Sequence, residues 1–347
     1  MKRLLFVFMM VLLVVSILAA NILFSSGFFR DIKPKMEGKI TASINLPGVE
    51  DIAISREDHF LVLSSDDRAA RRDSISTKGG LFLINLKDPE LTPIPISQHI
   101  KLTLNPHGIS MIKTDSSTYM ILVINHVEDQ HSVEKFNLYG DSLVHLESIT
   151  DPLFNSPNDL VAISEDEFYL TNDHKYRTGF NRILEDYLGM SLSNVIGYND
   201  GKATEVASEI AYANGINYDQ ESNLLFVAST RAFRVKVYQR RADGTLNYQE
   251  DIKVKTGVDN IEIDEDGKLW IACHPNLLMF ASYAKGKSEI APSEIITIDY
   301  RGIGDYELKS IFVNEGEVVS GSSVAIPFEN QVFIGNVMDD HVTVWER

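Results

Sequence analysis

The stretch Asn158-Asp159-Leu160-Val161-Ala162, followed after a polar turn by Phe168-Tyr169-Leu170-Thr171-Asn172, decides the fold. A polar pair stands before a short apolar strand, and a second, more apolar strand follows the turn. Copies of this arrangement recur every 45 to 63 residues, close to the usual length of a propeller blade. The copies begin at Glu50-Asp51-Ile52, His107-Gly108-Ile109, Asn158-Asp159-Leu160, Asn214-Gly215-Ile216, Asp259-Asn260-Ile261 and Ser322-Ser323-Val324. They predict an all-β fold, a six-bladed β-propeller.

The first strand of every propeller blade lines the central channel, so equivalent strand starts from different blades meet on the axis. A single polar pair is ordinary turn chemistry, because Asn, Asp and Gly are common turn residues. Six pairs in one register, most of them carrying a carboxylate or a carboxamide, are not explained by turns alone. We therefore expect the pairs to converge in the channel.

Oxygen donors dominate the predicted ring. Calcium takes about six to eight oxygen ligands in flexible geometry, whereas zinc prefers thiolates or several imidazoles. Two of the donors are carboxylates, so their formal charge would balance one Ca²⁺ ion. The ring therefore predicts a central calcium-binding tunnel, with side-chain oxygens from Glu50, Asn158, Asn214, Asp259 and Asn260.

Further side chains suggest a second cation and a base. Asp51 and Asp159 follow first-row residues by one position, and strand alternation would send them the other way, toward a structural ion deeper in the channel. His107 belongs to the first row, and His126 ends the second strand of the same blade. A lone histidine is most often a satisfied polar residue, but two beside a metal could activate water. His274, at the rim of another blade, is a weaker candidate for the pocket wall.

The N-terminus has the pattern of a membrane-targeting segment. Met1-Lys2-Arg3 precedes an apolar run from Leu4 to about Phe24, which is long enough to cross a bilayer. The run is longer than a usual signal peptide, and Leu18-Ala19-Ala20 is a poor cleavage site. We expect a signal anchor over residues 1–29 and an exported propeller over 30–347, periplasmic or extracellular, which would be secreted if the signal were cleaved.

Composition excludes some functions. The formal net charge of -17 and the lack of a basic run argue against a nucleic-acid partner. Cys273 is the single cysteine, so no intrachain disulfide can form, and its apolar strand predicts a buried thiol. Apolar residues at helical spacing over Phe180–Met190 predict an amphipathic helix. That helix could cap the propeller, or it could form a lid or a membrane-apposed surface.

Several of these stretches together resemble the paraoxonase and arylesterase family of calcium-dependent lactonases. They occur in family order and span nearly the whole predicted propeller. The matching stretches are Asn105-Pro106-His107-Gly108-Ile109-Ser110, Val123-Ile124-Asn125-His126, Asn158-Asp159-Leu160-Val161-Ala162, Phe168-Tyr169-Leu170-Thr171-Asn172-Asp173-His174, Ala213-Asn214-Gly215-Ile216-Asn217, Val258-Asp259-Asn260-Ile261 and Leu269-Trp270-Ile271-Ala272-Cys273-His274-Pro275-Asn276.

The resemblance implies two calcium ions in the tunnel of a six-bladed propeller. By position, the catalytic ion's ligands would be Glu50, Asn158, Asn214, Asp259 and Asn260. The structural ion's ligands would be Asp51, the backbone carbonyl of Ile109, and Asp159. The water-activating pair would be His107 and His126. The resemblance also supports a retained N-terminal segment and a helix near a membrane-facing mouth.

The chain departs from the family in two places. Mammalian members close the propeller with a disulfide, so closure here must rest on pairing between Ile40–Leu46 and Val342–Trp345. Among pocket-wall positions, Tyr212 and Tyr283 stay aromatic, but Ala281 stands where the family often has an aromatic residue. Substrate preference is therefore not carried over.

The resulting hypothesis is a calcium-dependent hydrolase of lactones and aryl esters, with phosphotriesters as a further candidate class. In this hypothesis calcium polarises the carbonyl group, and His107, assisted by His126, deprotonates the attacking water. Two alternatives stay open: a non-catalytic, calcium-stabilised binding module, and a sugar lactonase of the gluconolactonase-like type.

Overall fold

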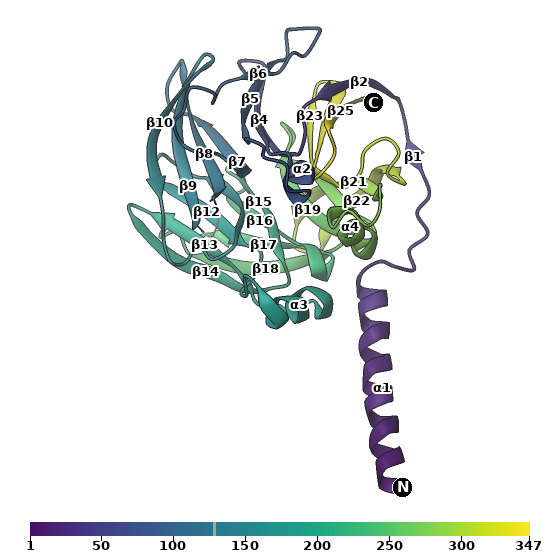
Figure 1. Cartoon of the computed structure of the whole chain (residues 1–347). Helices are drawn as coiled ribbons and strands as arrows, with labels where there is room; N and C mark the ends of the chain where they lie inside the picture. The colour runs from purple at the N-terminus through teal and green to yellow at the C-terminus, as the bar shows by residue number, and fades with distance from the viewer. Residues whose placement is uncertain (128–129) are drawn as a thin grey trace.

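Six antiparallel sheets surround one axis in the computed structural model, which describes residues 1–127 and 130–347 (Figure 1). Six clusters of buried apolar side chains fill the space between the sheets, and each cluster draws on two neighbouring sheets. The core is thus a ring of interfaces, and the predicted six-bladed β-propeller is confirmed.

In every blade the innermost strand pairs with the strand that follows it in the sequence. The innermost strands are β3 (Val49–Ser55), β7 (Pro106–Lys113), β11 (Pro157–Ala162), β15 (Ala213–Asp219), β19 (Gly257–Ile263) and β23 (Ser322–Phe328). The second strands are β4 (Phe60–Ser65), β8 (Thr118–Val127), β12 (Glu167–Asn172), β16 (Leu224–Ser229), β20 (Leu269–His274) and β24 (Gln331–Asn336).

Two further strands complete each blade on its outer side. The third strands are β5 (Gly80–Asn85), β9 (Gln130–Tyr139), β13 (Ser193–Asn199), β17 (Arg234–Arg240), β21 (Ser293–Gly302) and β25 (His341–Glu346). The outermost strands are β6 (Ile94–Pro95), β10 (Ser142–Ile149), β14 (Lys202–Ile210), β18 (Leu246–Lys253), β22 (Asp305–Asn314) and β2 (Lys39–Asn45). The short strand β1 (Lys35–Met36) extends the fifth blade at β22.

The two ends of the chain close the ring. β2, from the N-terminal side, pairs antiparallel with β25, the last strand, so that Ile40 faces Trp345 and Ile44 faces Val342. Ile44 is also buried in the cluster between the sixth and first blades. Closure by strand pairing between these segments is therefore confirmed.

The polar pairs lie inside the innermost strands, not before them as the sequence suggested, because each pair occupies a β-bulge. In all six blades the register with the second strand shifts at the pair, for example between Pro157 and Leu160. A bulge places two residues opposite one and re-aims their side chains. The repeated bulge is thus what turns each pair toward the axis.

Most of the helical segments follow the second strand of a blade, so they gather at one end of the propeller (Figure 1). The segments that share this position are α2 (Arg68–Arg72), α3 (Gly179–Leu188), the 3₁₀ turn η1 (Thr230–Ala232) and α4 (Leu277–Ala284). α3 confirms the amphipathic helix, whereas α4 was not predicted. The apolar helix α1 (Lys2–Ser25) projects from the same end.

Glycine is needed in the ring where neighbouring blades touch. A Cβ atom on Gly215 would lie 2.5 Å from the Cα atom of Asn260 and from the carbonyl oxygen of Asp259. Backbone cannot move aside as a flexible side chain can. Gly215→Ala should therefore destabilise the protein by about 1 to 3 kcal/mol, the usual cost of overpacking. Thermal unfolding of the full chain would measure this loss.

Gly197→Ala is the matched control, because the atoms nearest to its added Cβ belong to the side chains of Val206 and Tyr169. It should change the melting temperature less than Gly215→Ala. Equal melting temperatures for the two variants would contradict the close contact between the fourth and fifth blades.

Candidate active site

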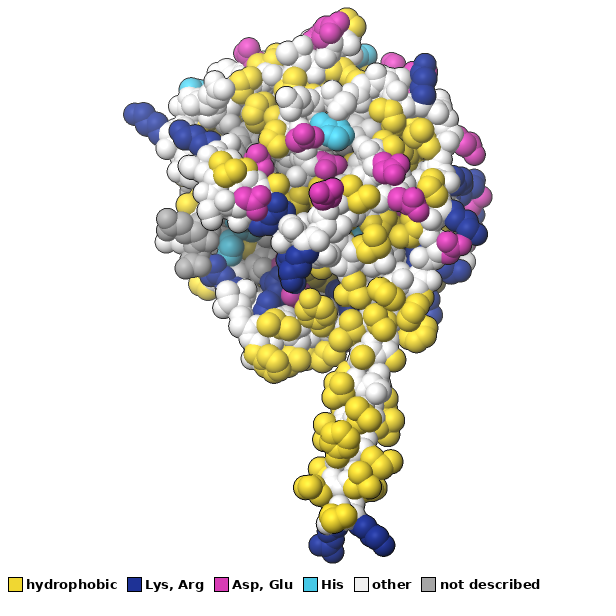
Figure 2. Space-filling view, turned by 45° about the vertical axis from the view of Figure 1, so that its right-hand side comes forward, with side chains coloured by type: hydrophobic (Ala, Val, Ile, Leu, Met, Phe, Trp, Pro, Cys, Tyr) yellow, Lys and Arg dark blue, Asp and Glu magenta, His cyan; other side chains and the backbone are white. Residues whose placement is uncertain are grey.

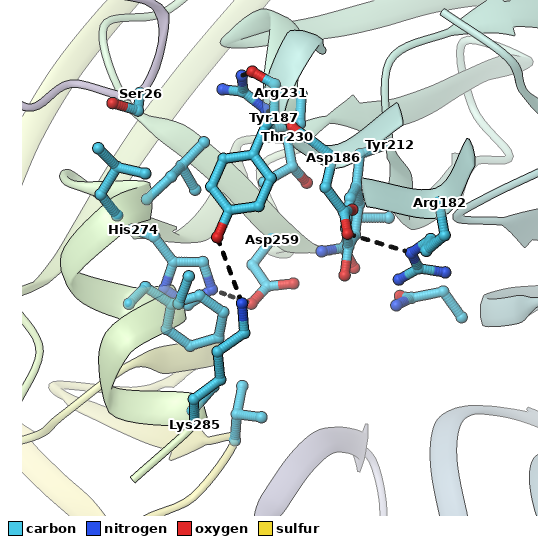
Figure 3. A pocket seen from close by; sticks show the side chains of 18 of the residues that line it. Ser26, Arg182, Asp186, Tyr187, Tyr212, Thr230, Arg231, Asp259, His274 and Lys285 are labelled. Carbon is cyan, nitrogen blue, oxygen red and sulfur yellow. Dashed lines mark hydrogen bonds and ion pairs between the residues drawn. The ribbon is translucent and has the colours of Figure 1, made fainter. Parts of the chain in front are cut away.

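A cavity of about 330 Å³ opens at the helical end of the propeller axis (Figure 3). Its floor is polar and comes from the innermost strands, with Glu50, His107, Asn158, Asn214 and Asp259. Its walls come largely from helices and combine apolar side chains, such as Ile22, Leu277, Leu278 and Phe280, with charged ones, such as Arg182, Asp186 and Lys285. The structure thus brings most of the first-row residues together at the end of the pocket; Asn260 does not line it.

The ring contains buried oxygens that lack hydrogen-bond partners. They are Oε2 of Glu50 and the Oδ1 atoms of Asn158, Asn214 and Asn260, all on residues at most 5% exposed. Buried polar atoms nearly always have a partner, so four orphans in one ring require an explanation. All four atoms are oxygens with free lone pairs, and a hard cation such as calcium is bound by oxygen ligands of this kind. The residues present therefore fit a calcium ion.

The oxygens of the ring belong to both carboxylates and carboxamides. Within the described residues, no three His, Cys, Asp or Glu side chains lie close enough to hold a metal ion by themselves. A metal site in this ring would therefore need the carboxamide oxygens as well as the carboxylates. Burial and the negative charge of Asp259 raise the pKa of Glu50 to about 8, against the opposing charge of Arg68. A bound divalent cation would remove this repulsion between the carboxylates.

Asp51 and Asp159 face a different cavity, of about 250 Å³, which Glu50 and Asn158 do not line. Each carboxylate spans two blades. Asp51 accepts hydrogen bonds from the N–H groups of Ile52 and Ile109, and Asp159 from those of Leu160 and Ile216. Burial, followed by the charges of neighbouring carboxylates, raises the pKa values of both well above the usual range. The two predicted layers are therefore separate.

The sixth pair, for which the sequence suggested no function, closes the ring. The Ser323 hydroxyl donates to the backbone carbonyl of Glu50 at 2.7 Å, which links the last blade to the first. The Asn260 amide donates to the same carbonyl at 3.0 Å and to Oε1 of Glu50 at 3.2 Å. Glu50 is thus held from the fifth blade and from the sixth.

His107 and His126 meet edge to face, with ring centroids 5.0 Å apart. Nε2 of His107 lies 3.6 Å from Oε1 of Glu50, and Arg68 lies 3.3 Å from Nδ1 on the other side of the ring. Nδ1 of His126 lies 2.8 Å from Nδ1 of His131. Burial lowers the pKa of His107 well below its usual range, helped by Arg68 and His126. Burial and His131 lower the pKa of His126 to about 3.

Arg68 and His131 were missed by the sequence analysis. Arg68 lies on α2 and also donates to the backbone carbonyls of Gly48 and Pro106, so it joins the first two blades. A guanidinium only donates hydrogen bonds, so the Nδ1 atom of His107 must accept, and the neutral ring carries its proton on Nε2. Neither residue belongs to the repeated pairs, and so no repeat could reveal them.

The predicted wall residues separate into two groups. His274 lines the pocket, donates from Nε2 to Asp259 at 2.8 Å, and stacks on Phe280 (Figure 3). Tyr212 and Ala281 also line the cavity. Tyr283 does not, because its hydroxyl is turned to Asp339 at 2.8 Å. Cys273 is fully buried, as predicted.

The end of α1 is built into the pocket. Ile22 and Ser26 line the cavity, and the Ser26 carbonyl accepts the N–H of Leu277 at 2.9 Å. Arg231, on η1, donates to the Ser25 carbonyl and to the carbonyls of Asp186 and Tyr187 in α3. α1 is long and apolar enough to cross a bilayer, and most of its side chains are exposed.

α3 lies against the propeller through its polar side. Glu185 is buried, and its carboxylate accepts the N–H groups of Lys175 and Tyr176. Phe180 and Ile183 point outward, with 70% and 52% of their surface exposed. An ordinary cap packs its apolar side on the core. Figure 2 shows apolar side chains gathered where α1 leaves the globular part, on the end that carries the pocket.

The fold and the site define a six-bladed propeller with an oxygen-lined ring beneath an apolar pocket. The chain belongs to the arylesterase family: the family model matches residues 29–343. The family supports a hydrolase of the lactonase and esterase kind.

Sequence relatives agree with this assignment. Serum paraoxonase/arylesterase 1 of Mus musculus is 34% identical over 263 residues, which cover 74% of this chain and 73% of the relative. Serum paraoxonase/arylesterase 2 of Gallus gallus is 33% identical over 265 residues, covering 75% and 74%. The resemblance described from the motifs is therefore confirmed.

Solved structures support the fold. A luciferin-regenerating enzyme is similar with a TM-score of 0.56 at 13% identity, over 90% of this chain and 94% of that one. A calcium-binding protein, regucalcin, from Agrobacterium tumefaciens is similar with a TM-score of 0.52 at 12% identity, over 89% and 93%. At these identities the likeness concerns the propeller architecture alone.

Proposed function

We propose that this chain is a calcium-dependent hydrolase of lactones and aryl esters, anchored in a membrane by α1 with its propeller exported. The observation that carries the calcium assignment is the set of four orphan oxygens in the ring. Glu50, Asn158, Asn214, Asp259 and Asn260 would hold a catalytic ion, and Asp51, Asp159 and the carbonyl of Ile109 a structural one. A calcium ion in the first layer would polarise the carbonyl group of the substrate and stabilise the developing oxyanion.

The chain's own residues supply binding and proton transfer. The apolar walls hold the acyl or aryl part of the substrate away from water. His107 takes the proton of the attacking water, and His126 supports it through their edge-to-face contact. To accept that proton at Nε2, His107 must carry its own proton on Nδ1, so the contact with Arg68 has to open in the reacting complex.

The membrane belongs to this proposal because two apolar surfaces lie beside the pocket. α1 ends in the pocket wall, and the outward side of α3 carries Phe180 and Ile183. An interfacial helix sits with such a side in the boundary between lipid headgroups and acyl chains. This supports a membrane-apposed role for the helix, in which the mouth of the pocket would lie where apolar substrates concentrate.

The two alternatives are disfavoured by the pocket. A sugar lactonase would need polar groups around the substrate's hydroxyls, whereas helical side chains such as Leu277, Leu278 and Ala284 make much of this wall apolar. A purely structural calcium propeller needs only the Asp51 and Asp159 layer. It has no use for the orphan oxygens of Glu50, Asn158 and Asn214, residues that line a second cavity.

Metal removal is the direct test. In the full chain in detergent, EDTA should abolish hydrolysis of a panel of lactones and aryl esters and lower the melting temperature, and added Ca²⁺ should restore both. The panel should include phosphotriesters and a sugar lactone. Full activity in EDTA would refute the calcium assignment, and calcium-dependent melting without turnover of any substrate would favour the binding module.

A further inference from the structure

α3 is attached to the third blade through a buried histidine. His174 follows β12 and is 1% exposed. Its Nε2 atom lies 2.6 Å from Oδ1 of Asp186, on α3, and its Nδ1 atom lies 2.7 Å from Oδ1 of Asp173, at the end of the blade strand. One imidazole therefore stands between two carboxylates that belong to two different elements.

The surroundings of His174 favour its charged form. Nε2 donates a hydrogen bond to Asp186, whereas the Nδ1 approach to Asp173 lies outside hydrogen-bond geometry and acts through charge. Burial lowers the pKa of His174, but Asp173 and Asp186 outweigh it and raise that pKa above its usual value. The other titratable groups on the packed elements are Arg182, which opposes the charge, Glu185, which binds backbone N–H groups, and Tyr212, whose ring is 4.5 Å away.

Much of what fastens α3 is polar. Its apolar residues Phe180 and Ile183 are turned away from the propeller, and Leu184 and Leu188 are only partly buried, so hydrophobic burial holds the helix weakly. Further polar attachments are the Glu185 carboxylate on two N–H groups, and Arg231 on the carbonyls of Asp186 and Tyr187. Yet Arg182, Asp186 and Tyr187 all line the pocket (Figure 3). The position of a pocket wall thus depends on a few polar contacts.

We propose that His174 is the positioning residue of this wall: its imidazolium holds α3 on the third blade between Asp173 and Asp186, and the wall loosens when the ring loses its proton. The effect on substrate binding rests on the proposed function, whereas the attachment of α3 does not. The direction follows from the raised pKa of His174. The stabilisation is complete below the pKa of an unfolded histidine, about 6.5, and is lost as the pH rises through the folded value.

Hydrogen exchange on the full chain in detergent, at constant Ca²⁺, tests the attachment. Protection factors of the α3 amides, corrected for intrinsic exchange, should fall as the pH rises from about 6 to about 10, a range that spans a raised histidine pKa. Asp186→Asn should give low protection at every pH, because a neutral amide cannot hold the imidazolium. His174→Gln should behave in the same way.

Asp251→Asn is the matched control, since it breaks the ion pairs of a partly exposed carboxylate with Arg234 and Lys236 on the fourth blade and leaves α3 untouched. It should keep the wild-type pH dependence of α3. A wild-type α3 whose protection does not change with pH would overturn the proposal. So would an Asp186→Asn variant that keeps both the protection and the pH dependence of the wild type.

If the chain hydrolyses esters, steady-state kinetics provide a second test of the role of α3. At pH 6, Asp186→Asn should raise KM by roughly five- to tenfold, as expected when the partly exposed anionic partner of a buried imidazolium is lost, with kcat nearly unchanged. An unchanged KM would show that α3 does not position the substrate. Because exchange is measured without substrate, absence of any hydrolysis would refute the proposed function and leave the attachment of α3 still tested.

Discussion

Replacing Asn158 by alanine should reduce hydrolysis of lactones and aryl esters by about 10³-fold or more, because a catalytic metal ion supplies several kcal/mol of transition-state stabilisation. Asn158 comes from the third blade, and Glu50 and Asn260, from the first and fifth, cannot replace an oxygen on that side of the ring. Steady-state rates at saturating Ca²⁺ would measure the loss.

The same variant should separate metal binding from folding. The Asn158 side chain makes no hydrogen bond within the described residues, and its Oδ1 atom is a buried orphan. Removing an unsatisfied polar atom does not cost a hydrogen bond. In EDTA, Asn158→Ala should therefore be at least as stable as the wild type, whereas in Ca²⁺ it should be less stable. Thermal melting with and without the metal would show this reversal of sign.

Asn199→Ala is the control for Asn158→Ala, because Asn199 is an exposed carboxamide at the end of β13. It should change neither the rate nor the calcium-dependent melting. If Asn158→Ala kept the wild-type activity and the wild-type gain of stability in Ca²⁺, the first-layer ligand set would be wrong.

Replacing His107 by glutamine should lower the rate of lactone hydrolysis by about 10²- to 10⁴-fold, the usual contribution of a general base. Glutamine is the informative substitute, because its side-chain oxygen can still accept a hydrogen bond from Arg68 but cannot take a proton. His107 is not a predicted calcium ligand. The variant should therefore keep the calcium-dependent rise in melting temperature that Asn158→Ala loses.

His99→Gln serves as the control for this second variant, since His99 is an exposed imidazole outside the pocket. An unchanged rate in His107→Gln would remove His107 from the role of base. A lost rate together with lost calcium-dependent melting would instead mean that His107 supports the metal ligands through its contact with Glu50.

The fold was predictable because its unit repeats. Six copies of one hairpin indicated the number of blades and the place of the polar pairs, and the lack of cysteines for the family's closing disulfide pointed to pairing of the chain ends, now β2 and β25. The bulges were not predictable, since an unpaired residue leaves no trace in a single strand's pattern. α4 was missed because its sequence, Leu277-Leu278-Met279-Phe280, is apolar on every side and shows no helical period.

The candidate site was predictable only where it follows the repeat. Glu50, Asn158, Asn214, Asp259 and Asn260 share a register, so their convergence could be expected. Arg68 and His131 reach the histidine pair from a loop helix and from a third strand. Their place depends on how blades pack, and periodicity carries no information about it. The sequence also could not predict which face of α3 packs on the propeller, because a helical pattern shows that two faces exist without showing which one turns inward.

The pairing of β2 with β25 sets the order of events during synthesis. β2 leaves the ribosome early, yet its partner, residues 341–346, is the last strand to be made. If the chain is exported as proposed, the ring of blades stays an open arc until residues 341–346 have crossed. The closed propeller around the proposed cation site would therefore form only in the compartment that receives the finished chain.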